Sequence, residues 1–366
     1  MIYVILGTKA QLIKMAPIMA LMQERGIDYR FIFTGQHQET IDALRDNFSV
    51  KPPDIILHTG RDITSIPAML WWVIKIVVAT LRKRREMFPI RTGVVLIHGD
   101  TFSTLLGAIM GKLAGLKIAH VESGLRSFNI FHPFPEELTR LATFYLSDIY
   151  FCPGRWAVNN LAGIRGLKID TGFNTLLDAV RLMREQFHRA NAEIPNYPYC
   201  VVSTHRFENI FSASRLKRVI ALVEQIAVQY RVLFVLHPVT SRKLEQFGLM
   251  ARVKNNPRIE LRPRYDYIKF LKLVSGAQFL ATDGGSNQEE CAYLGKPCLL
   301  LRGATERQEG LGYNVIISKY DSNVVSNFLQ GYSSFVGQSL LKAESPSQII
   351  LDHLLMMDSH PKVANV

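Results

Sequence analysis

Cysteine is scarce in this 366-residue chain, and none of its four cysteines belongs to a pair with the spacing of a metal site. Cys152, Cys200, Cys291 and Cys298 are too widely spaced for a Cys-x-x-Cys motif, and three of them stand in apolar runs. This pattern is typical of buried thiols in a reducing compartment. We therefore expect no disulfide, no metal site and a cytoplasmic protein.

The sequence also lacks the pattern of a secretory signal and a membrane-spanning run. Residues Ile2–Leu6 lead directly into Gly7, without a basic region or a small-residue cleavage site. One apolar segment, Ala68–Leu81, stands out, but a bilayer-spanning helix needs about 20 apolar residues. The segment contains Trp71 and Trp72 and is followed by Arg-Lys-Arg-Arg at 82–85. Two interpretations stay open: a helix in a core or a homodimer interface, which we favour, and a helix on the inner face of a membrane, with Ala68–Arg85 as the contact.

No nucleic-acid-binding motif accompanies the basic charge. The 43 basic and 31 acidic residues give a formal net charge of +12. The basic residues are scattered, and no helix-turn-helix, RNP or zinc-finger pattern is present, so we expect no nucleic-acid partner. A diphosphate substrate or an anionic membrane surface fits this charge better.

Short β-branched runs alternate with longer amphipathic stretches along the chain. This alternation predicts two doubly wound α/β domains with Rossmann-like parallel sheets, facing each other across a cleft. We expect them at 1–173 and 174–340, followed at 341–366 by a helix and tail, for which packing of the helix on the first domain is one option. Ligands of such folds bind beyond the carboxyl ends of the strands. The predicted strands are Tyr3–Leu6, Arg30–Thr34, Val94–His98, Lys117–Val121, Ile149–Cys152, Cys200–Thr204, Val232–His237, Ile259–Arg262, Gln278–Thr282 and Cys298–Arg302.

In the first domain, polar residues stand where predicted strands end. Lys9 and Lys14 belong to the start of the first helix, where backbone N–H groups face an anion. Asp100 and Glu122 each follow a strand, and Glu136 comes fourteen residues after Glu122. Taken singly, each carboxylate is more often a helix cap or a solvated surface residue. Together they can divide acid and base work at one sheet edge.

The second domain shows the same arrangement. His205 and Arg206 follow a strand, where a histidine can protonate a leaving group and an arginine can hold phosphate oxygens. The turn Asp283–Ser286 joins a strand to a helix, and its small residues and free amides predict an anion cradle. Glu290, one turn further on, is placed to accept hydrogen bonds from ribose hydroxyls.

Eight segments, in this order and at matching spacings, resemble the motif series of the non-hydrolysing UDP-N-acetylglucosamine 2-epimerases. They cover nearly the whole chain, and the hydrolysing branch of the superfamily has a different segment where HVESGLR stands. The segments are GTKAQLIKMAP (7–17), TGQH (34–37), HGD (98–100), HVESGLR (120–126), PFPEE (133–137), THRFEN (204–209), QEECAYLGKP (288–297) and ATER (304–307).

The resemblance implies a GT-B-like fold that binds a UDP-sugar between two domains, with no cofactor. UDP is eliminated to leave an enzyme-bound glycal, which is protonated at C2 on the other face as UDP returns, supplying sugar for cell-surface polysaccharide. The positions that match the catalytic residues of the family are Asp100, Glu122, Glu136 and His205. Those expected to bind substrate are Lys9, Lys14, Arg126, Arg206, Gly284, Gly285, Ser286 and Arg307, with Phe270 on the uridine base and Glu290 on the ribose.

Some positions depart from the family pattern. Lys9 stands where arginine is usual, the phosphate turn reads Gly-Gly-Ser instead of Ser-Gly-Gly, and Phe207 replaces a second arginine. A second hypothesis is therefore a GT-B glycosyltransferase that passes a UDP-sugar to a lipid-linked acceptor, which the Trp71–Trp72 segment favours. The complete set of acids beside the expected C2 position favours the epimerase.

Overall fold

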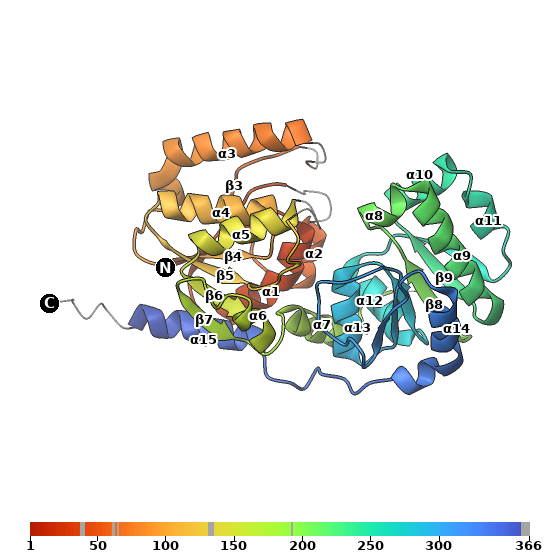
Figure 1. The fold of residues 1–366 in the computed structure, drawn as a ribbon. Coiled ribbons are helices and arrows are strands. Elements are labelled where there is room, and N and C mark those ends of the chain that lie inside the picture. Colours follow the sequence, from red (N-terminus) through yellow and green to blue (C-terminus); the bar gives the residue numbers. More distant parts are fainter. Residues whose placement is uncertain (37–40, 61–62, 64–65, 131–134, 192, 360–366) are drawn as a thin grey trace. The chain divides into compact units, whose positions relative to one another are not determined.

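The computed structural model describes residues 1–36, 41–60, 63, 66–130, 135–191 and 193–359 (Figure 1). His37 of the TGQH segment and Pro133 and Phe134 of the PFPEE segment lie outside the described residues. The chain forms two compact units, and each is considered by itself. Unit 1 comprises Met1–Ala179 with Glu344–Val366, and unit 2 comprises Val180–Ala343.

The sheet of unit 1 has seven parallel strands among the described residues, in the order β3-β2-β1-β4-β5-β6-β7. Figure 1 shows α3 and α4 on one face of this sheet and α1 and α15 on the other. The strands are β1 (Ile2–Leu6), β2 (Tyr29–Phe33), β3 (Ile55–Ile56), β4 (Val94–His98), β5 (Lys117–Val121), β6 (Ile149–Cys152) and β7 (Leu167–Asp170). The helices are α1 (Lys9–Glu24), α2 (Ile41–Asn47), α3 (Ile66–Met87), α4 (Phe102–Leu113), α5 (Glu136–Leu146), α6 (Arg155–Asn159), α7 (Leu176–Glu185), which continues into unit 2, and α15 (Pro346–Ser359).

Unit 2 repeats this plan with six parallel strands in its described part, in the order β10-β9-β8-β11-β12-β13. The strands are β8 (Cys200–Ser203), β9 (Val232–Leu236), β10 (Ile259–Pro263), β11 (Leu280–Thr282), β12 (Cys298–Leu300) and β13 (Val315–Ile317). The helices are α8 (Phe207–Ile210), α9 (Ala213–Gln229), α10 (Pro238–Gln246), α11 (Met250–Lys254), α12 (Tyr267–Gly276), α13 (Gly285–Leu294), α14 (Ser322–Gly331) and the 3-10 helix η1 (Tyr332–Phe335).

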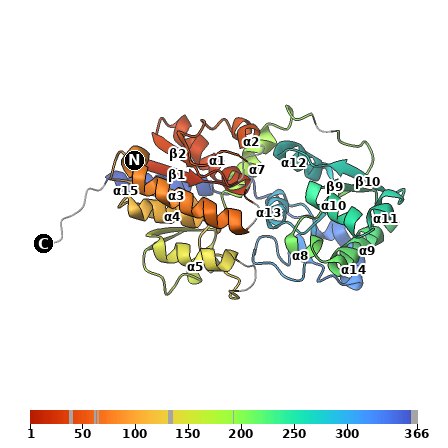
Figure 2. The same ribbon diagram turned by 90° about the horizontal axis from the view of Figure 1, so that it is seen from above.

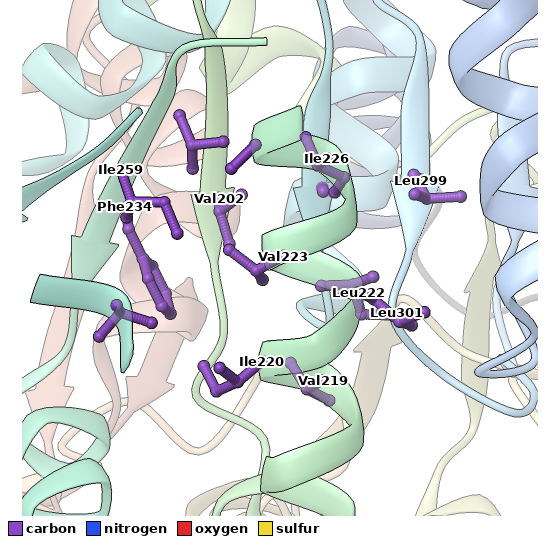
Figure 3. Close-up of a cluster of buried hydrophobic side chains, with 14 of the residues drawn as sticks. Val202, Val219, Ile220, Leu222, Val223, Ile226, Phe234, Ile259, Leu299 and Leu301 are labelled. Atoms are coloured by element: carbon purple, nitrogen blue, oxygen red, sulfur yellow. The ribbon is translucent and has the colours of Figure 1, made fainter. Parts of the chain in front are cut away.

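The core of each sheet explains its parallel topology. Strands covered by helices on both faces have no solvent-facing side, so their sequences are mostly apolar instead of alternating. In unit 2, Val202 on β8 and Phe234 on β9 pack against Val219, Val223 and other apolar residues of α9 (Figure 3). The four cysteines are buried and free, as the sequence predicted.

The ten predicted strands are all present, and the two-domain α/β fold is confirmed. Three further strands, β3, β7 and β13, were not predicted. Each lies at a sheet edge or next to one and has two to four residues, so its sequence carries little periodicity. The helix α15 packs against α1, where Arg25 Nη1 lies 3.1 Å from Asp352 Oδ1. No helix in the described part of the chain is long and apolar enough to cross a membrane.

The order of the strands locates the candidate sites. In unit 1 the chain leaves β1 toward β2 on one side and β4 lies on the other, and in unit 2 β9 and β11 flank β8 in the same way. Such a switch point opens a crevice at the carboxyl ends of the strands. Residues that follow β1, β4 and β5, and those that follow β8 and β11, therefore lie at the ligand-binding edges.

Candidate active site

The turn after β1 is organised by Gln11. Thr8 caps α1, and the Gln11 side chain accepts hydrogen bonds from the backbone N–H groups of Gly7 and Thr8 at 2.9 and 3.1 Å. The amide nitrogen of Gln11 donates to the carbonyl of His98 at 2.8 Å, which ties the start of α1 to the end of β4. Lys9 is half-buried at the first position of the helix. This positive helix end therefore faces the edge where β4 ends.

Glu122 lies at the centre of a buried polar cluster in unit 1. Its Oε2 accepts from Lys14 Nζ and from Asn174 Nδ2 at 2.6 Å, and His98 Nε2 lies 3.0 Å away. The side chains of Lys14, His98 and Glu122 are at most 5% exposed. Glu122 has a φ of 60°, a left-handed conformation that costs free energy in a residue other than glycine. The fold thus holds the Glu122 carboxylate at the end of β5 in a strained backbone conformation, fixed by contacts with Lys14, Asn174 and His98.

A second chain of charges begins at Asp100, after β4. Arg140 on α5 contacts Asp100 Oδ2 through Nη2 at 2.6 Å and Nε at 2.9 Å, and its Nη1 reaches Glu137 at 3.1 Å. Glu137 is completely buried and also accepts from Arg126 Nε and the Ser127 backbone. Burial alone would raise the pKa of Glu137, but these donors outweigh it and hold that pKa below its usual value. Glu137 thereby positions both arginines.

Glu136 is the first residue of α5 and directly precedes Glu137. Its side chain is half-buried in the first helical turn, so it is more accessible than Glu137 or Glu122. Arg126 forms an ion pair with the buried Glu137. Its guanidinium lies 4.8 Å from the centre of the exposed Phe128 ring. Of the predicted residues of unit 1, Lys14 pairs with Glu122, whereas Asp100 is held by Arg140, which the sequence did not predict.

His120, on β5, lies close to both groups. Its Nε2 lies 2.7 Å from the carbonyl of Gly99 and its Nδ1 lies 3.1 Å from Ser123 Oγ, which fits a neutral ring that donates to Gly99 and accepts from Ser123. Burial lowers the pKa of His120 to about 4, although the Gly99 carbonyl, Asp100 and Glu122 act in the opposite direction. The histidine is therefore neutral at pH 7.

This lowered pKa predicts a pH-dependent stability. An unfolded histidine titrates near 6.5, so between about pH 6.5 and 4 the unfolded chain binds the extra proton and folding stability falls as the pH falls. His120 should contribute about 3 kcal/mol that is present above pH 6.5 and lost toward pH 4. His120→Gln should flatten the pH dependence of the unfolding free energy measured by urea titration. His188→Gln, at an exposed position, is the control, and an unchanged slope in His120→Gln would contradict the assignment.

In unit 2, Asp283 holds together the loops after β8 and β11. Its buried carboxylate accepts from the backbone N–H groups of His205 and Arg206 at 2.9 and 3.1 Å and from Asn209 Nδ2 at 2.9 Å. The pKa of Asp283 is nevertheless raised, because its desolvation outweighs these donors. Asp283 therefore fixes the backbone that carries His205 and Arg206.

The sequence predicted an anion cradle at the N-terminus of α13, where small residues begin the helix. Gly284 caps the helix and Gly285 begins it, and Ser286 follows, partly exposed. A Cβ added to Gly285 would lie 2.7 Å from Arg307 Nε and 3.2 Å from Arg206 Nη2. Both guanidinium groups therefore approach the backbone at the positive end of the helix. The Gly284 N–H donates to Thr282 Oγ1 at 3.1 Å, so the helix amides from Gly285 onward and the two arginines are the groups that suit a diphosphate.

Buried carboxylates pair with the arginines at the start of α13. Arg307 Nη1 binds the buried Glu289, while Glu306 lies 3.5 Å from Arg206 Nη2 and 3.4 Å from Arg302 Nη2. Burial acts to raise the pKa of Glu306, but the charges of the surrounding arginines lower it to about 2. Glu306 therefore stays ionised and orients Arg206.

Glu290 lies one turn further along α13 and is 4% exposed. Asn287 Nδ2 donates to its Oε2 at 2.9 Å, and the Tyr267 phenol lies beside it, with a pKa raised by burial and by the nearby carboxylate. Phe270, on α12 like Tyr267, is partly buried against the apolar core beneath the sheet. A carboxylate thus lies one turn beyond the start of α13, with the Tyr267 phenol beside it.

His205 stacks on His237, with ring centroids 4.5 Å apart, and its Nδ1 lies 3.7 Å from Asp283 Oδ1. Burial, followed by the charges of Arg206 and Arg264, lowers the pKa of His205 to about 4. The imidazole is therefore neutral at pH 7 in the unliganded protein. A bound polyanion would favour its protonated form.

Sequence reasoning did not identify the residues that position the others. Asn174 stands at the predicted domain boundary, and Arg140 lies inside an amphipathic helix, so neither follows a predicted strand. Tyr267 and Glu306 carry no local signal of burial. Glu137 was the most accessible to prediction, because it stands next to Glu136 in a quoted segment.

Two Rossmann-like sheets, braced carboxylates in one unit and a cationic helix N-terminus in the other define a nucleotide-sugar enzyme. Residues 19–342 match the family model described as UDP-N-acetylglucosamine 2-epimerase, and the chain belongs to that family. It is 32% identical to the UDP-N-acetylglucosamine 2-epimerase of Methanocaldococcus jannaschii over 329 residues, which are 86% of this chain and 87% of that protein.

Solved structures agree with this assignment. A crystal structure of M. jannaschii UDP-GlcNAc 2-epimerase in complex with UDP-GlcNAc and UDP has a TM-score of 0.80 at 26% identity, covering 97% of this chain and 99% of that one. The enzyme from Neisseria meningitidis bound to UDP-GlcNAc has a TM-score of 0.83 at 26% identity, with the same coverage. The resemblance to the epimerases noted from the motifs is therefore confirmed.

Proposed function

We propose that this protein inverts C2 of UDP-N-acetylglucosamine, or of a close relative, by eliminating UDP and adding it back, and so supplies a sugar for polysaccharide. The observation that carries the proposal is Glu122, a strained carboxylate braced by Lys14 and Asn174 within a member of this family. An exposed structural acid would need neither the strain nor the bracing.

Unit 2 holds the leaving group in this proposal. The diphosphate binds at the start of α13, where Gly284 lets the backbone approach closely, Gly285 and Ser286 offer backbone N–H groups, and Arg206 and Arg307 offer guanidinium groups. These donors stabilise the charge that develops on the β-phosphate oxygen as the C1–O bond breaks. Glu290 accepts from the ribose hydroxyls, and Phe270 lies against the uracil ring.

Unit 1 supplies the proton transfers. A carboxylate among Asp100, Glu122 and Glu136 takes the C2 proton, the C2–H electron pair forms the C1=C2 double bond, and the C1–O pair leaves with UDP. In the second half, UDP oxygen attacks C1 while a different group delivers a proton to the opposite face of C2. Lys9, Lys14 and Arg126 position the sugar relative to the carboxylates.

His205 acts on the phosphate side. Its neutral imidazole gains a proton when the diphosphate binds, because the added negative charge favours the imidazolium. It then donates this proton to the departing oxygen of UDP and takes it back when UDP adds to C1 again. Glu306, which stays ionised, keeps Arg206 directed toward the same phosphates.

The test of the function is incubation with UDP-GlcNAc and related UDP-hexosamines, followed by proton NMR of the sugar. The expected product is the manno epimer, formed without any acceptor. Release of UDP only in the presence of a lipid-linked acceptor, without an epimer, would instead identify a glycosyltransferase.

Glu290→Gln should weaken UDP binding about tenfold while the protein stays folded, because a hydrogen bond to a charged acceptor is worth about 1.5 kcal/mol. The substitution keeps the shape of the side chain and removes its charge. Isothermal calorimetry with UDP measures the change, and Glu245→Gln, on the exposed surface of α10, is the control. Equal affinity for UDP in Glu290→Gln and the wild type would remove Glu290 from the site.

A further inference from the structure

Helix α3 carries an apolar stripe on its outward face. Its opposite face is buried, where Trp72 Nε1 donates to the carbonyl of Thr34 at 3.1 Å. Figures 1 and 2 show α3 at the outer side of unit 1, with α4 beneath it and no other described element of that unit above it. The stripe, with exposed fractions from 38% to 61%, consists of Leu70, Trp71, Ile74, Val78 and Leu81. Its spacing places these side chains along one line of the helix.

A basic cluster, Arg82–Arg85, continues directly from the stripe. All four residues are exposed, and the helix bends at Lys83. Lys75 adds a charge beside the stripe, with its Nζ 5.5 Å from the centre of the exposed Trp71 ring. Arg84 Nη1 donates to the carbonyl of Leu113 at 3.1 Å, which holds the cluster against the end of α4. Arg82 and Arg85 stand four residues after Val78 and Leu81 of the stripe, so apolar and cationic side chains adjoin on the outward face.

The charges on this surface decide between a second copy of the chain and an anionic surface. In a parallel pair of α3 helices, the two basic clusters would meet each other. In an antiparallel pair, each cluster would meet the other helix's N-terminus, which is positive and has no acidic residue in its first turn. The exposed Glu86 follows the cluster, but residues 82–86 still carry a net charge of about +3, so both arrangements bring positive ends together, whereas an anionic surface is complementary to them.

We propose that α3 docks unit 1 onto the anionic surface of a lipid bilayer. The stripe enters the boundary between headgroups and acyl chains, with Trp71 at the headgroup level, as in interfacial amphipathic helices. Lys75 and the basic cluster remain among the anionic headgroups. The docking does not use the candidate active site, so it stands or falls independently of the proposed epimerase activity.

The test is flotation of the purified full-length protein with vesicles of phosphatidylcholine alone or with about 30% phosphatidylglycerol. The wild type should float with the anionic vesicles only, and about 0.5 M salt should release it, because that salt screens surface charges. Arg82→Gln with Arg85→Gln should lower the partition coefficient about thirtyfold. Trp71→Ser with Leu81→Ser should lower it about tenfold or more. The matched control is Lys217→Gln with Val228→Ser, on exposed positions of α9.

Fluorescence locates the contact. Trp71 is 60% exposed and Trp72 is 2% exposed, so brominated lipids should quench Trp71 selectively and Trp71→Phe should remove that quenching.

Light scattering tests the homodimer predicted from the sequence. Failure of the wild-type protein to float with anionic vesicles would overturn the proposal. A dimer that dissociates in the Trp71→Ser, Leu81→Ser variant would show that a second copy covers the stripe instead. Flotation unaffected by both sets of substitutions would also exclude α3 as the docking surface.

Discussion

Replacing Glu136 with glutamine is expected to stop deuterium incorporation at C2 of the sugar, with a loss of about a hundredfold or more. C2 cannot change configuration while its bond to hydrogen is retained, so each inversion in deuterated water must exchange that proton. Glu136 is a carboxylate that the fold leaves half-buried at the start of α5. Glutamine keeps its shape and cannot transfer the proton. NMR of the C2 position measures the exchange.

Glu122→Gln should cause a comparable loss but is the less selective test. It leaves the Lys14 ammonium buried beside a neutral amide, so the variant should also lose stability, and its fold must be checked by circular dichroism. Glu136→Gln should retain UDP affinity, because the proposed UDP contacts lie in unit 2. Glu245→Gln is the matched control for both. Full C2 exchange in folded Glu122→Gln and Glu136→Gln would sink the assignment of both residues.

Gly285→Ala is expected to lower UDP affinity about a hundredfold, equivalent to about 2.7 kcal/mol. The new methyl group would lie 2.7 Å from Arg307 Nε, 3.1 Å from Arg307 Cδ and 3.2 Å from Arg206 Nη2. Both side chains end in flexible guanidinium groups, so they should move aside and the fold should survive. The movement would break up the donor arrangement, and the methyl group would stand where a phosphate approaches the helix amides.

Gly303→Ala provides the control for this prediction. A Cβ at Gly303 would meet only the Tyr320 ring, at 3.8 Å, which is an ordinary van der Waals contact. Calorimetry with UDP should therefore show a normal affinity for Gly303→Ala and a weak one for Gly285→Ala, with similar melting temperatures. If Gly285→Ala binds UDP normally, the diphosphate does not bind at the start of α13.

The local signals that the sequence carried were those of strands and of the residues that end them. An interior strand of a parallel sheet is mostly apolar and does not alternate with polar residues, so β4, β5 and β6 were predicted with the bounds that they have. The carboxyl ends of parallel strands share one edge, so Asp100 and Glu122, which follow the neighbouring strands β4 and β5, could be predicted to lie at one edge of the sheet before any contact was known. The glycines at the start of α13 led to the prediction of an anion site there, which UDP binding to Gly285→Ala will test.

Only the tertiary structure decided which side chains brace the site. Asn174 reaches Glu122 across 52 residues and Arg140 reaches Asp100 across 40, and such pairings depend on how the chain folds rather than on any local pattern. The protonation of His120 and His205 was equally beyond the sequence, because burial, which lowers both pKa values, is a property of the packed chain. The exposed stripe on α3 shows the same division. Its residues are as apolar in sequence as the buried Trp72 and Ile76, and only the packing of α3 on the sheet decides which of them face outward.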